Sequence, residues 1–374
     1  MNTKKSQLVC ILLALFLVDA AGAFADQVLS LRYARGFKVS PYAGCCLVTV
    51  HPPWSEGGPT FRYLLVPQGH AVPEGYRPAQ VFFVPVQRVV SLSVTHLAYM
   101  DSAGLTDRLV GLAGFKYVNT PSVRRRIDAG ALKEAGQLTN LNIETLIDLE
   151  PDLILAFASG SSYDVSSKLL EAGLPVALTI GHLEAHPLGR TEWVKFLGLF
   201  FGTVPHAEAL FKQIEERYLR LAKTAAQVSK RPRVITGALF RGQWWVPGAD
   251  SFVTRLIVDA GGKPAWPQIP GTGSRPMDLE VVYEKALAAD VWLNTGSWQT
   301  IAEARAADPR FSEVPALRRG MVYNNNKRLN PWGGNDYWES GMLRPDVVLA
   351  DLIAILHPDL LPDHELVYYR RLER

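Results

Sequence analysis

Cysteine is scarce in this chain of 374 residues, which contains only three. Cys10 lies near the N-terminus, and Cys45 and Cys46 are adjacent. A bond between adjacent cysteines would close a strained ring, so we expect two packed free thiols. There is no CxxC pair, which excludes a disulfide framework. Net charge is also small, at +3, and gives no reason to expect a nucleic-acid partner.

Long apolar runs are confined to the N-terminus. Residues 1–25 combine Lys4 and Lys5 with an apolar stretch and the sequence Ala23-Phe24-Ala25, which is typical of a cleavable secretory signal. No cysteine stands at the cleavage point, so we expect a mature protein of the periplasm without a lipid anchor. No later segment reaches the roughly 18 apolar residues of a membrane-spanning helix.

The rest of the chain divides by its pattern. Short β-like runs separated by turn residues fill the first part, and apolar strands then alternate with short helices in two separate stretches. This βα alternation predicts two Rossmann-like α/β lobes with parallel sheets. Between them, apolar residues at spacings of three and four predict one long helix over 205–228. The expected organisation is 26–87 β-rich extension, 88–190 N-terminal lobe, 191–230 linking helices, 231–345 C-terminal lobe, and 346–374 closing helix and tail.

Four segments in a fixed order resemble a known family. They are "RVVSLSVTHLAYMDSAGLTDRLVGLAGF" (88–115), "LNIETLIDLEPDLILAF" (141–157), "FVTRLIVDAGG" (252–262) and "MDLEVVYEKALAADVWLN" (277–294). Together they are similar to the periplasmic substrate-binding proteins of ABC importers whose lobes are joined by one rigid helix. Two features depart from that family: the extension over 27–87, whose role stays open, and His96, where many relatives carry Glu.

The resemblance implies a function. The family binds ferric siderophores, haem or cobalamin, so we expect a monomeric receptor that delivers a metal chelate, a ferric siderophore or a corrinoid, to the permease dimer of an ABC importer. Closure of a few degrees to about ten is expected from the rigid helix, by analogy. The resemblance also implies that Glu144 and Glu280 dock on the permease. A plainer explanation for both is a first-turn acid favoured by the helix dipole.

Ligand contacts are expected where strands end, because open α/β sheets bind ligands at the carboxyl ends of their strands. Aromatic rings suit flat ligands, and guanidinium groups hold carboxylates or catecholates. Rings, cations and one amide gather in these loops. The predicted ligand-binding residues are Lys116, Tyr117, Arg190, Arg241, Trp244, Trp245, Trp298, Lys327, Arg328, Asn335, Tyr337 and Trp338.

The stretch "NNNKRLNPWGGNDYWES" (324–340) follows a predicted strand of the C-terminal lobe. Glycines and amides favour turns, so we expect a loop here. We expect this loop to line the cleft; the alternative is that it only packs Trp332 and Trp338 against its own lobe.

A receptor for haem or a bare transition-metal ion is the alternative function. His96, His182 and His186 with Asp336 or Glu184 are ligand types for zinc or manganese. His96 or Tyr117 would be an axial ligand of haem. An enzyme is a third class, since hydrolases and nitrogenase-like cofactor enzymes share the βα alternation. The sequence has no GxSxG, P-loop, strand-following GxGxxG or HExxH motif. We therefore expect no enzyme and no cofactor.

Overall fold

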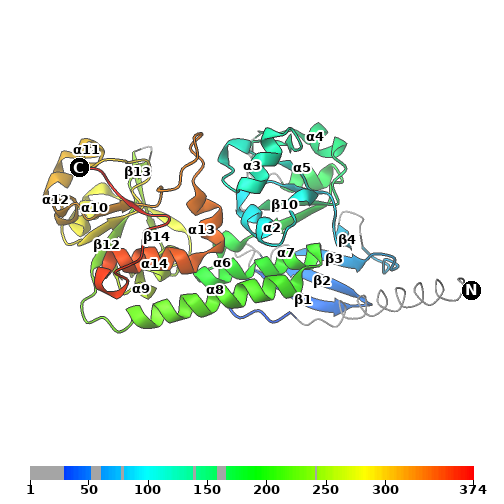
Figure 1. Ribbon diagram of the computed structural model, residues 1–374, viewed down its shortest axis with the longest axis horizontal. Helices are drawn as coiled ribbons and strands as arrows, with labels where there is room; N and C mark the ends of the chain where they lie inside the picture. The colour runs from blue at the N-terminus through cyan, green and yellow to red at the C-terminus, as the bar shows by residue number, and fades with distance from the viewer. Residues whose placement is uncertain (1–28, 52–59, 77–79, 138–139, 158–165, 241) are drawn as a thin grey trace, which may run out of the picture.

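The computed structural model describes residues 29–51, 60–76, 80–137, 140–157, 166–240 and 242–374. Two α/β lobes lie side by side, and a smaller sheet adjoins the first of them (Figure 1). The predicted secretory signal falls outside the described residues. No helix within the described ranges is long and apolar enough to cross a membrane.

The extension folds as a sheet of four strands in the order β1-β2-β3-β4. The first two pairs are antiparallel, and β4 runs parallel to β3. Side chains alternate between the two faces of a strand, so one face of this sheet joins the hydrophobic core of the N-lobe, with Val48, Tyr63 and Phe82 buried there. The strands are β1 (Phe37–Tyr42), β2 (Cys45–Val50), β3 (Phe61–Pro67) and β4 (Val81–Val84). Cys45 and Cys46 are free and buried, as expected.

The N-lobe contains a fully parallel sheet in the order β11-β10-β5-β6-β7. Strands β5, β10 and β11 are short apolar runs with every residue buried or nearly so, because helices cover both faces. The strands are β5 (Val89–Ser91), β6 (Leu109–Leu112), β7 (Lys133–Glu134), β10 (Leu153–Phe157) and β11 (Val176–Thr179), with a hairpin of β8 (Gly136–Gln137) and β9 (Asn140–Leu141). The helices are α2 (Leu97–Ser102), α3 (Pro121–Asp128), α4 (Ile143–Asp148) and α5 (Ser166–Glu171).

The C-lobe repeats the plan with the order β15-β12-β17-β18-β19, in which only β19 is antiparallel. A second sheet, β13-β14-β16, was not predicted. The strands are β12 (Arg233–Thr236), β13 (Leu239–Phe240), β14 (Gln243–Pro247), β15 (Lys263–Pro264), β16 (Ser274–Met277), β17 (Val291–Leu293), β18 (Val322–Asn324) and β19 (Arg370–Arg371). The helices are α9 (Phe252–Asp259), α10 (Leu279–Ala286), α11 (Ile301–Ala307) and α12 (Pro315–Arg319).

Helices between and after the two sheets run along both lobes. The predicted long helix is present as α8 (Val204–Ala225), with Pro205 in its first turn, where the missing N–H has no intrahelical partner to lose. It packs against α7 (Val194–Phe201) on the N-lobe side and against α14 (Pro345–Leu356) on the C-lobe side, and Figure 1 shows it beneath both lobes. The short helices α6 (Pro187–Glu192) and α13 (Ser340–Leu343) lie between the lobes.

Candidate functional site

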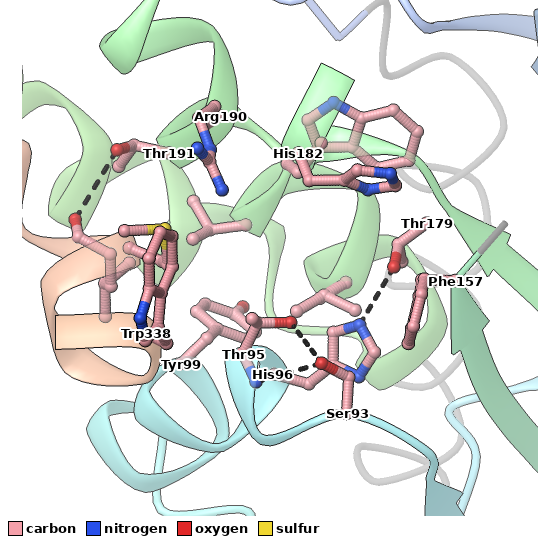
Figure 2. Close-up of a pocket in the computed structure, with 16 residues that line it drawn as sticks. Ser93, Thr95, His96, Tyr99, Phe157, Thr179, His182, Arg190, Thr191 and Trp338 are labelled. Carbon is pink, nitrogen blue, oxygen red and sulfur yellow. Dashed lines mark hydrogen bonds between the residues drawn. The ribbon is translucent and has the colours of Figure 1, made fainter. Parts of the chain in front are cut away.

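A cavity of about 280 Å³ opens where the N-lobe strands end. Strands β5, β10 and β11 supply residues at or just past their carboxyl ends, helices α6 and α7 form one wall, and α13 closes the C-lobe side (Figure 2). The lining is Ser93, Thr95, His96, Tyr99, Phe157, Thr179, Gly181, His182, Arg190, Thr191, Trp193, Val194, Leu197, Trp338, Met342 and Leu343. The position agrees with the expectation that open α/β sheets bind ligands at the carboxyl ends of their strands.

His96 lies at the bottom of the cavity and is buried. Its Nδ1 is 2.8 Å from the Ser91 hydroxyl, and its Nε2 is 2.9 Å from the Thr179 hydroxyl. Burial lowers the pKa of His96 to about 4, so the ring is neutral near pH 7. Both ring nitrogens are occupied, and direct coordination of a metal would require breaking one of these hydrogen bonds.

Arg190 is the cation of the cavity. Its guanidinium carbon lies 3.8 Å from the centroid of the Phe252 ring, and Nη1 is buried without a hydrogen-bond partner among the described residues. Burial lowers its pKa to about 10, which still leaves the group charged at neutral pH. A buried guanidinium whose donor has no acceptor is costly, so this position favours an anionic or oxygen-rich ligand group.

Aromatic side chains form the walls around Arg190. Trp193, at the end of α6, is a lining residue. Trp338 reaches in from the C-lobe (Figure 2), and its side chain is about half exposed. Phe157 and Tyr99 add further rings, with the Tyr99 hydroxyl 2.8 Å from that of Thr203. The cavity therefore combines a mostly apolar surface with one charged donor, as ligand pockets commonly do.

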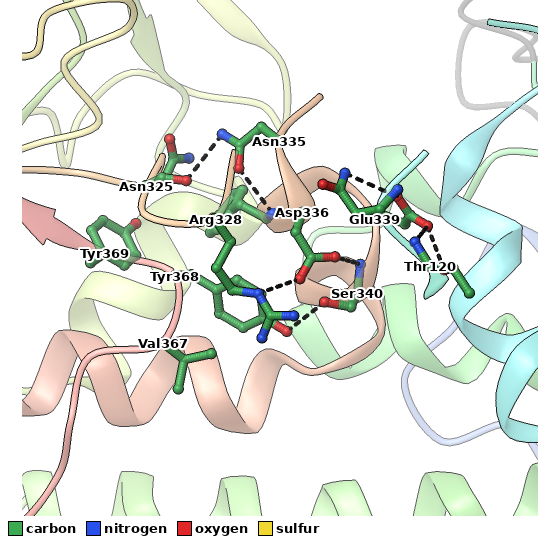
Figure 3. Close-up of polar contacts among 12 residues, drawn as sticks. Thr120, Asn325, Arg328, Asn335, Asp336, Glu339, Ser340, Val367, Tyr368 and Tyr369 are labelled. Atoms are coloured by element: carbon green, nitrogen blue, oxygen red, sulfur yellow. Dashed lines mark hydrogen bonds and ion pairs between the residues drawn. The ribbon is translucent and has the colours of Figure 1, made fainter. Parts of the chain in front are cut away.

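The 324–340 stretch crosses from the C-lobe to the N-lobe. Glu339, which is fully buried, accepts hydrogen bonds from the Asn119 amide and from the backbone and hydroxyl of Thr120 (Figure 3). Asn330 donates to the carbonyls of Lys116 and Val118 at 2.9 and 3.0 Å. We call these contacts between Asn330–Glu339 and 116–120 the clasp. The clasp connects the two lobes, a role that neither of the two expectations for this loop included.

Gly334 and Trp332 shape the clasp. A Cβ atom on Gly334 would lie 2.6 Å from the carbonyl oxygen of Tyr117, so only glycine allows this approach. The half-exposed Trp332 ring lies under Arg124 of α3, 4.6 Å from its guanidinium carbon. Trp332 therefore packs against the opposite lobe and not, as the alternative proposed, against its own.

The structure brings two of the twelve predicted ligand residues, Arg190 and Trp338, to the cavity. Trp244 and Trp298 are instead buried in the C-lobe core, where they pack with Trp292 and Phe311. The prediction for these two is wrong, because Trp244 points to the inner face of β14. The neighbouring Trp245 alternates to the outer face and is exposed, away from the cavity.

Other predicted residues have structural partners. Lys116 and Tyr117 are exposed and contact each other, and Lys327 donates to the Leu366 carbonyl. Arg328 forms an ion pair with Asp336 at 2.8 Å (Figure 3). Asn335 and Tyr337 also have structural roles. The Asn335 side chain accepts a hydrogen bond from the backbone amide of Tyr337. Tyr337 is buried among Tyr368 and Tyr369. Arg241 falls outside the described residues.

The metal alternative finds little support. The structure brings His96 and His182 to the same cavity, but no group of three or more His, Cys, Asp or Glu side chains suited to a metal occurs in the described ranges. His186 caps α6 by accepting from the Leu188 amide at 3.0 Å, and Glu184 binds backbone amides of the extension.

The predicted docking residues lie at the surface. Glu144 is exposed in the first turn of α4, and Glu280 is exposed in the first turn of α10. Glu280 forms an ion pair with Arg310 at 2.8 Å, an arrangement not anticipated from the sequence. Both positions are accessible to a partner.

Sequence reasoning missed Trp193, Thr191 and Met342 as lining residues, and Glu339 as the centre of the clasp. Trp193 lies in "GHLEAHPLGRTEW" (181–193), the segment after strand β11, so the rule that ligands bind at the carboxyl ends of strands could have identified it. Glu339 had no such signal, because a single acid in a polar loop is normally exposed.

Comparisons with known proteins agree with this architecture. The family model for periplasmic binding proteins matches residues 89–329. An uncharacterised lipoprotein of Methanocaldococcus jannaschii is 25% identical over 359 residues, covering 92% of this chain and 87% of that protein. A cobalamin-binding protein of Halobacterium salinarum is 27% identical over 198 residues, covering 52% of this chain and 50% of that protein.

Solved structures share the fold. A periplasmic haem-binding protein from Pseudomonas aeruginosa has a TM-score of 0.57 at 22% identity, covering 77% of this chain and 99% of that one. The molybdate-binding protein of a Haemophilus influenzae ABC transporter has a TM-score of 0.58 at 18% identity, covering 77% and 92%.

Proposed function

Because the chain belongs to the periplasmic binding protein family, we propose that it is the receptor of an ABC importer and that its ligand is a metal chelate, either a corrinoid or a ferric siderophore. The family places the protein in the periplasm or outside the cell. Absence of a lipid anchor remains a prediction, since the relative from Methanocaldococcus jannaschii is named a lipoprotein. The receptor binds and releases its ligand without covalent chemistry.

One observation carries the ligand class: Arg190, whose Nη1 has no hydrogen-bond partner among the described residues, lines a cavity walled by aromatic rings. A guanidinium pairs with the carboxylates or catecholates of siderophores and with the amide oxygens of a corrin. Trp193 and Trp338 offer faces to a flat or apolar ligand. The cobalamin-binding relative supports the corrinoid.

The cavity in this arrangement is smaller than a whole chelate. Ligand pockets typically measure about 300–1,000 Å³, and a corrin with its side chains is larger than about 280 Å³. The clasp therefore has to open for the ligand to enter. With the lobes apart, Trp338 on the C-lobe side and Arg190 on α6 contact opposite sides of the ligand.

Haem is the second candidate, because Arg190 would pair equally well with a propionate. An axial His96 is disfavoured, since both of its nitrogens are hydrogen-bonded. Haemin therefore belongs among the probes of any binding assay.

The test is binding of cyanocobalamin, a ferric catecholate siderophore and haemin to the purified protein, followed by fluorescence quenching. We expect one chelate to bind and Arg190→Ala to lower its affinity about 10- to 100-fold, as for a lost hydrogen bond to a charged group. The exposed Arg125→Ala on α3 serves as the matched control and should bind normally. If Arg190→Ala bound every probe as tightly as the wild type does, this result would contradict the assignment of the site.

Docking is tested separately. We propose that Glu144 and Glu280 contact the permease, because both are exposed first-turn acids, one on each lobe. Replacing both by Lys should abolish uptake and leave chelate affinity unchanged. Loss of chelate binding in that variant would count against a docking role.

A further inference from the structure

The extension lies outside the family match, which begins at residue 89, yet it is bound tightly to the helices that form the cavity wall. Glu192 of α6, which is fully buried, accepts hydrogen bonds from the backbone amides of 32–34 at 2.8–3.0 Å. Glu184 accepts the next two amides, those of Arg35 and Gly36, at 2.9–3.0 Å. Five consecutive amides of 32–36 thus meet two carboxylates. We call this set of contacts the joint.

The joint extends directly to a side chain of the ligand cavity. The same Glu184 carboxylate accepts the indole N–H of Trp193 at 3.0 Å, and Trp193 lines the cavity. Phe37 also packs against this indole, with ring centroids 4.7 Å apart. The orientation of Trp193 therefore depends on Phe37, which belongs to the extension, and on Glu184, which is hydrogen-bonded to the extension.

Gly36 leaves space for the indole. A Cβ atom on Gly36 would lie 2.9 Å from Cζ2 of Trp193 and 3.0 Å from the Ile180 side chain. Glu184 and Phe37 hold the indole at the place that a methyl group on Gly36 would contact. Gly36→Ala would therefore push Trp193 out of its present position.

A second contact reaches the same cavity through β11, the edge strand of the N-lobe sheet. The hydroxyl of Tyr63 in β3 accepts the backbone amide of Leu178 at 2.9 Å. The next residue, Thr179, lines the cavity and holds the ring of His96. The extension thus fixes the floor of the cavity as well as its wall.

We propose that the β-rich extension shapes the ligand cavity from behind, through Gly36, Phe37 and Tyr63, and is a determinant of which chelate the cavity accepts. This inference rests on the proposed function for its ligand. Its positioning role concerns Trp193 and Thr179 alone and is measurable without any ligand.

The experiment uses the full-length mature protein labelled with 5-fluorotryptophan. The ¹⁹F resonance of Trp193 is assigned by its loss in Trp193→Phe. We expect Gly36→Ala to shift this resonance and to lower affinity for the chelate that binds the wild type about tenfold, with a changed order of preference among cyanocobalamin, the ferric siderophore and haemin. Tyr63→Phe should produce a weaker effect of the same kind, and Ser40→Ala, exposed on β1, should change nothing.

The outcomes separate the two proposals. If none of the three chelates binds the wild type but Gly36→Ala still shifts the Trp193 resonance, the proposed ligand class fails and the positioning role stands. If Gly36→Ala leaves the resonance and all affinities as in the wild type, the extension does not shape the cavity. A loss of affinity that is uniform across probes, with Trp193 unmoved, would also overturn the inference.

Discussion

Two buried carboxylates do similar work at different places in the molecule. Glu192, in the joint, and Glu339, in the clasp, are both fully buried and both accept several N–H or O–H groups from a distant segment. They differ in their surroundings. Lys195 lies 2.8 Å from Glu192, whereas no cation pairs with Glu339 among the described residues.

The difference appears in their pKa values. Burial tends to raise the pKa of Glu192, but hydrogen bonds from Ala34, Lys195 and Tyr33 outweigh it and the pKa is lowered. Burial raises the pKa of Glu339, and the hydrogen bonds from Thr120 and Asn119 do not compensate. A carboxylate with its own cation suits a permanent contact. A carboxylate without one suits a contact that opens, because water restores its solvation when the lobes part.

The largest expected effect is on the joint. Glu192→Ala leaves the Lys195 ammonium buried without its partner and three backbone amides without an acceptor. Breaking a buried pair in this way costs about 3–5 kcal/mol, so the free energy of unfolding in urea should fall by that amount. The exposed Glu216→Ala on α8 is the control. A loss below about 1 kcal/mol would show that the joint is not a stabilising contact.

The clasp should respond differently. Glu339→Ala removes its acceptor, but the freed amides of Asn119 and Thr120 gain water once the lobes separate. We therefore expect little change in the free energy of unfolding, and about tenfold faster chelate dissociation, as for one or two lost hydrogen bonds. Gly334→Ala should act alike by steric contact with Tyr117, whereas Gly273→Ala, where no atom lies within 4 Å of the added Cβ, should not. Stopped-flow displacement measures the rate.

Acidification should act on the two contacts in opposite directions. The lowered pKa of Glu192 contributes stability above its ordinary value of 4.5, and this contribution is lost as the pH falls through the folded-state pKa. The raised pKa of Glu339 means that its ionisation opposes the closed clasp, so closure is favoured at low pH and weakens as the pH rises through that raised value.

Two measurements separate these effects. Urea unfolding below pH 4.5 should be less pH-dependent in Glu192→Gln than in the wild type. Distances between nitroxides at exposed Lys133 and Arg305, after replacement of Cys45 and Cys46 by serine, should shorten as the pH falls from neutral towards the ordinary carboxyl value of 4.5, and this shortening should vanish in Glu339→Gln. If acidification weakened both contacts, or strengthened both, the proposed difference between Glu192 and Glu339 would be contradicted.

The smallest effect is expected at Trp332. Its ring lies under Arg124 but is half exposed, so water screens the contact, which contributes about 0.5–1 kcal/mol. Trp332→Ala should widen the nitroxide distance distribution slightly and speed chelate dissociation about threefold. Leu329→Ala, exposed in the same loop, provides the matched control.

Local patterns in the sequence predicted the fold, but they predicted only part of the candidate site. Apolar strands alternating with short helices predicted both parallel sheets, and the three-and-four spacing placed α8 within three residues of its observed ends. The same reasoning misplaced Trp244 and Trp298. Two adjacent aromatics on a strand must face opposite sides, and the sequence alone does not say which side is the core.

The contacts of three buried carboxylates were not predicted from the sequence. Glu192 stands three residues before Lys195 within an apolar helical stretch, a spacing that places opposite charges side by side on a helix and predicts an ion pair. Glu184 was considered only as a metal ligand. Glu339 meets residues about 220 positions away, and a contact of that separation leaves no local trace in the sequence.

The length of helix α8 relates a small change in its tilt to the distance across the clasp. Its 22 residues make a lever roughly 33 Å long at about 1.5 Å per residue. Tilting such a lever by about 5° carries its far end through about 3 Å, which equals the length of one hydrogen bond of the clasp. If the clasp opens as proposed, a tilt of this size would be enough to part Glu339 from Thr120.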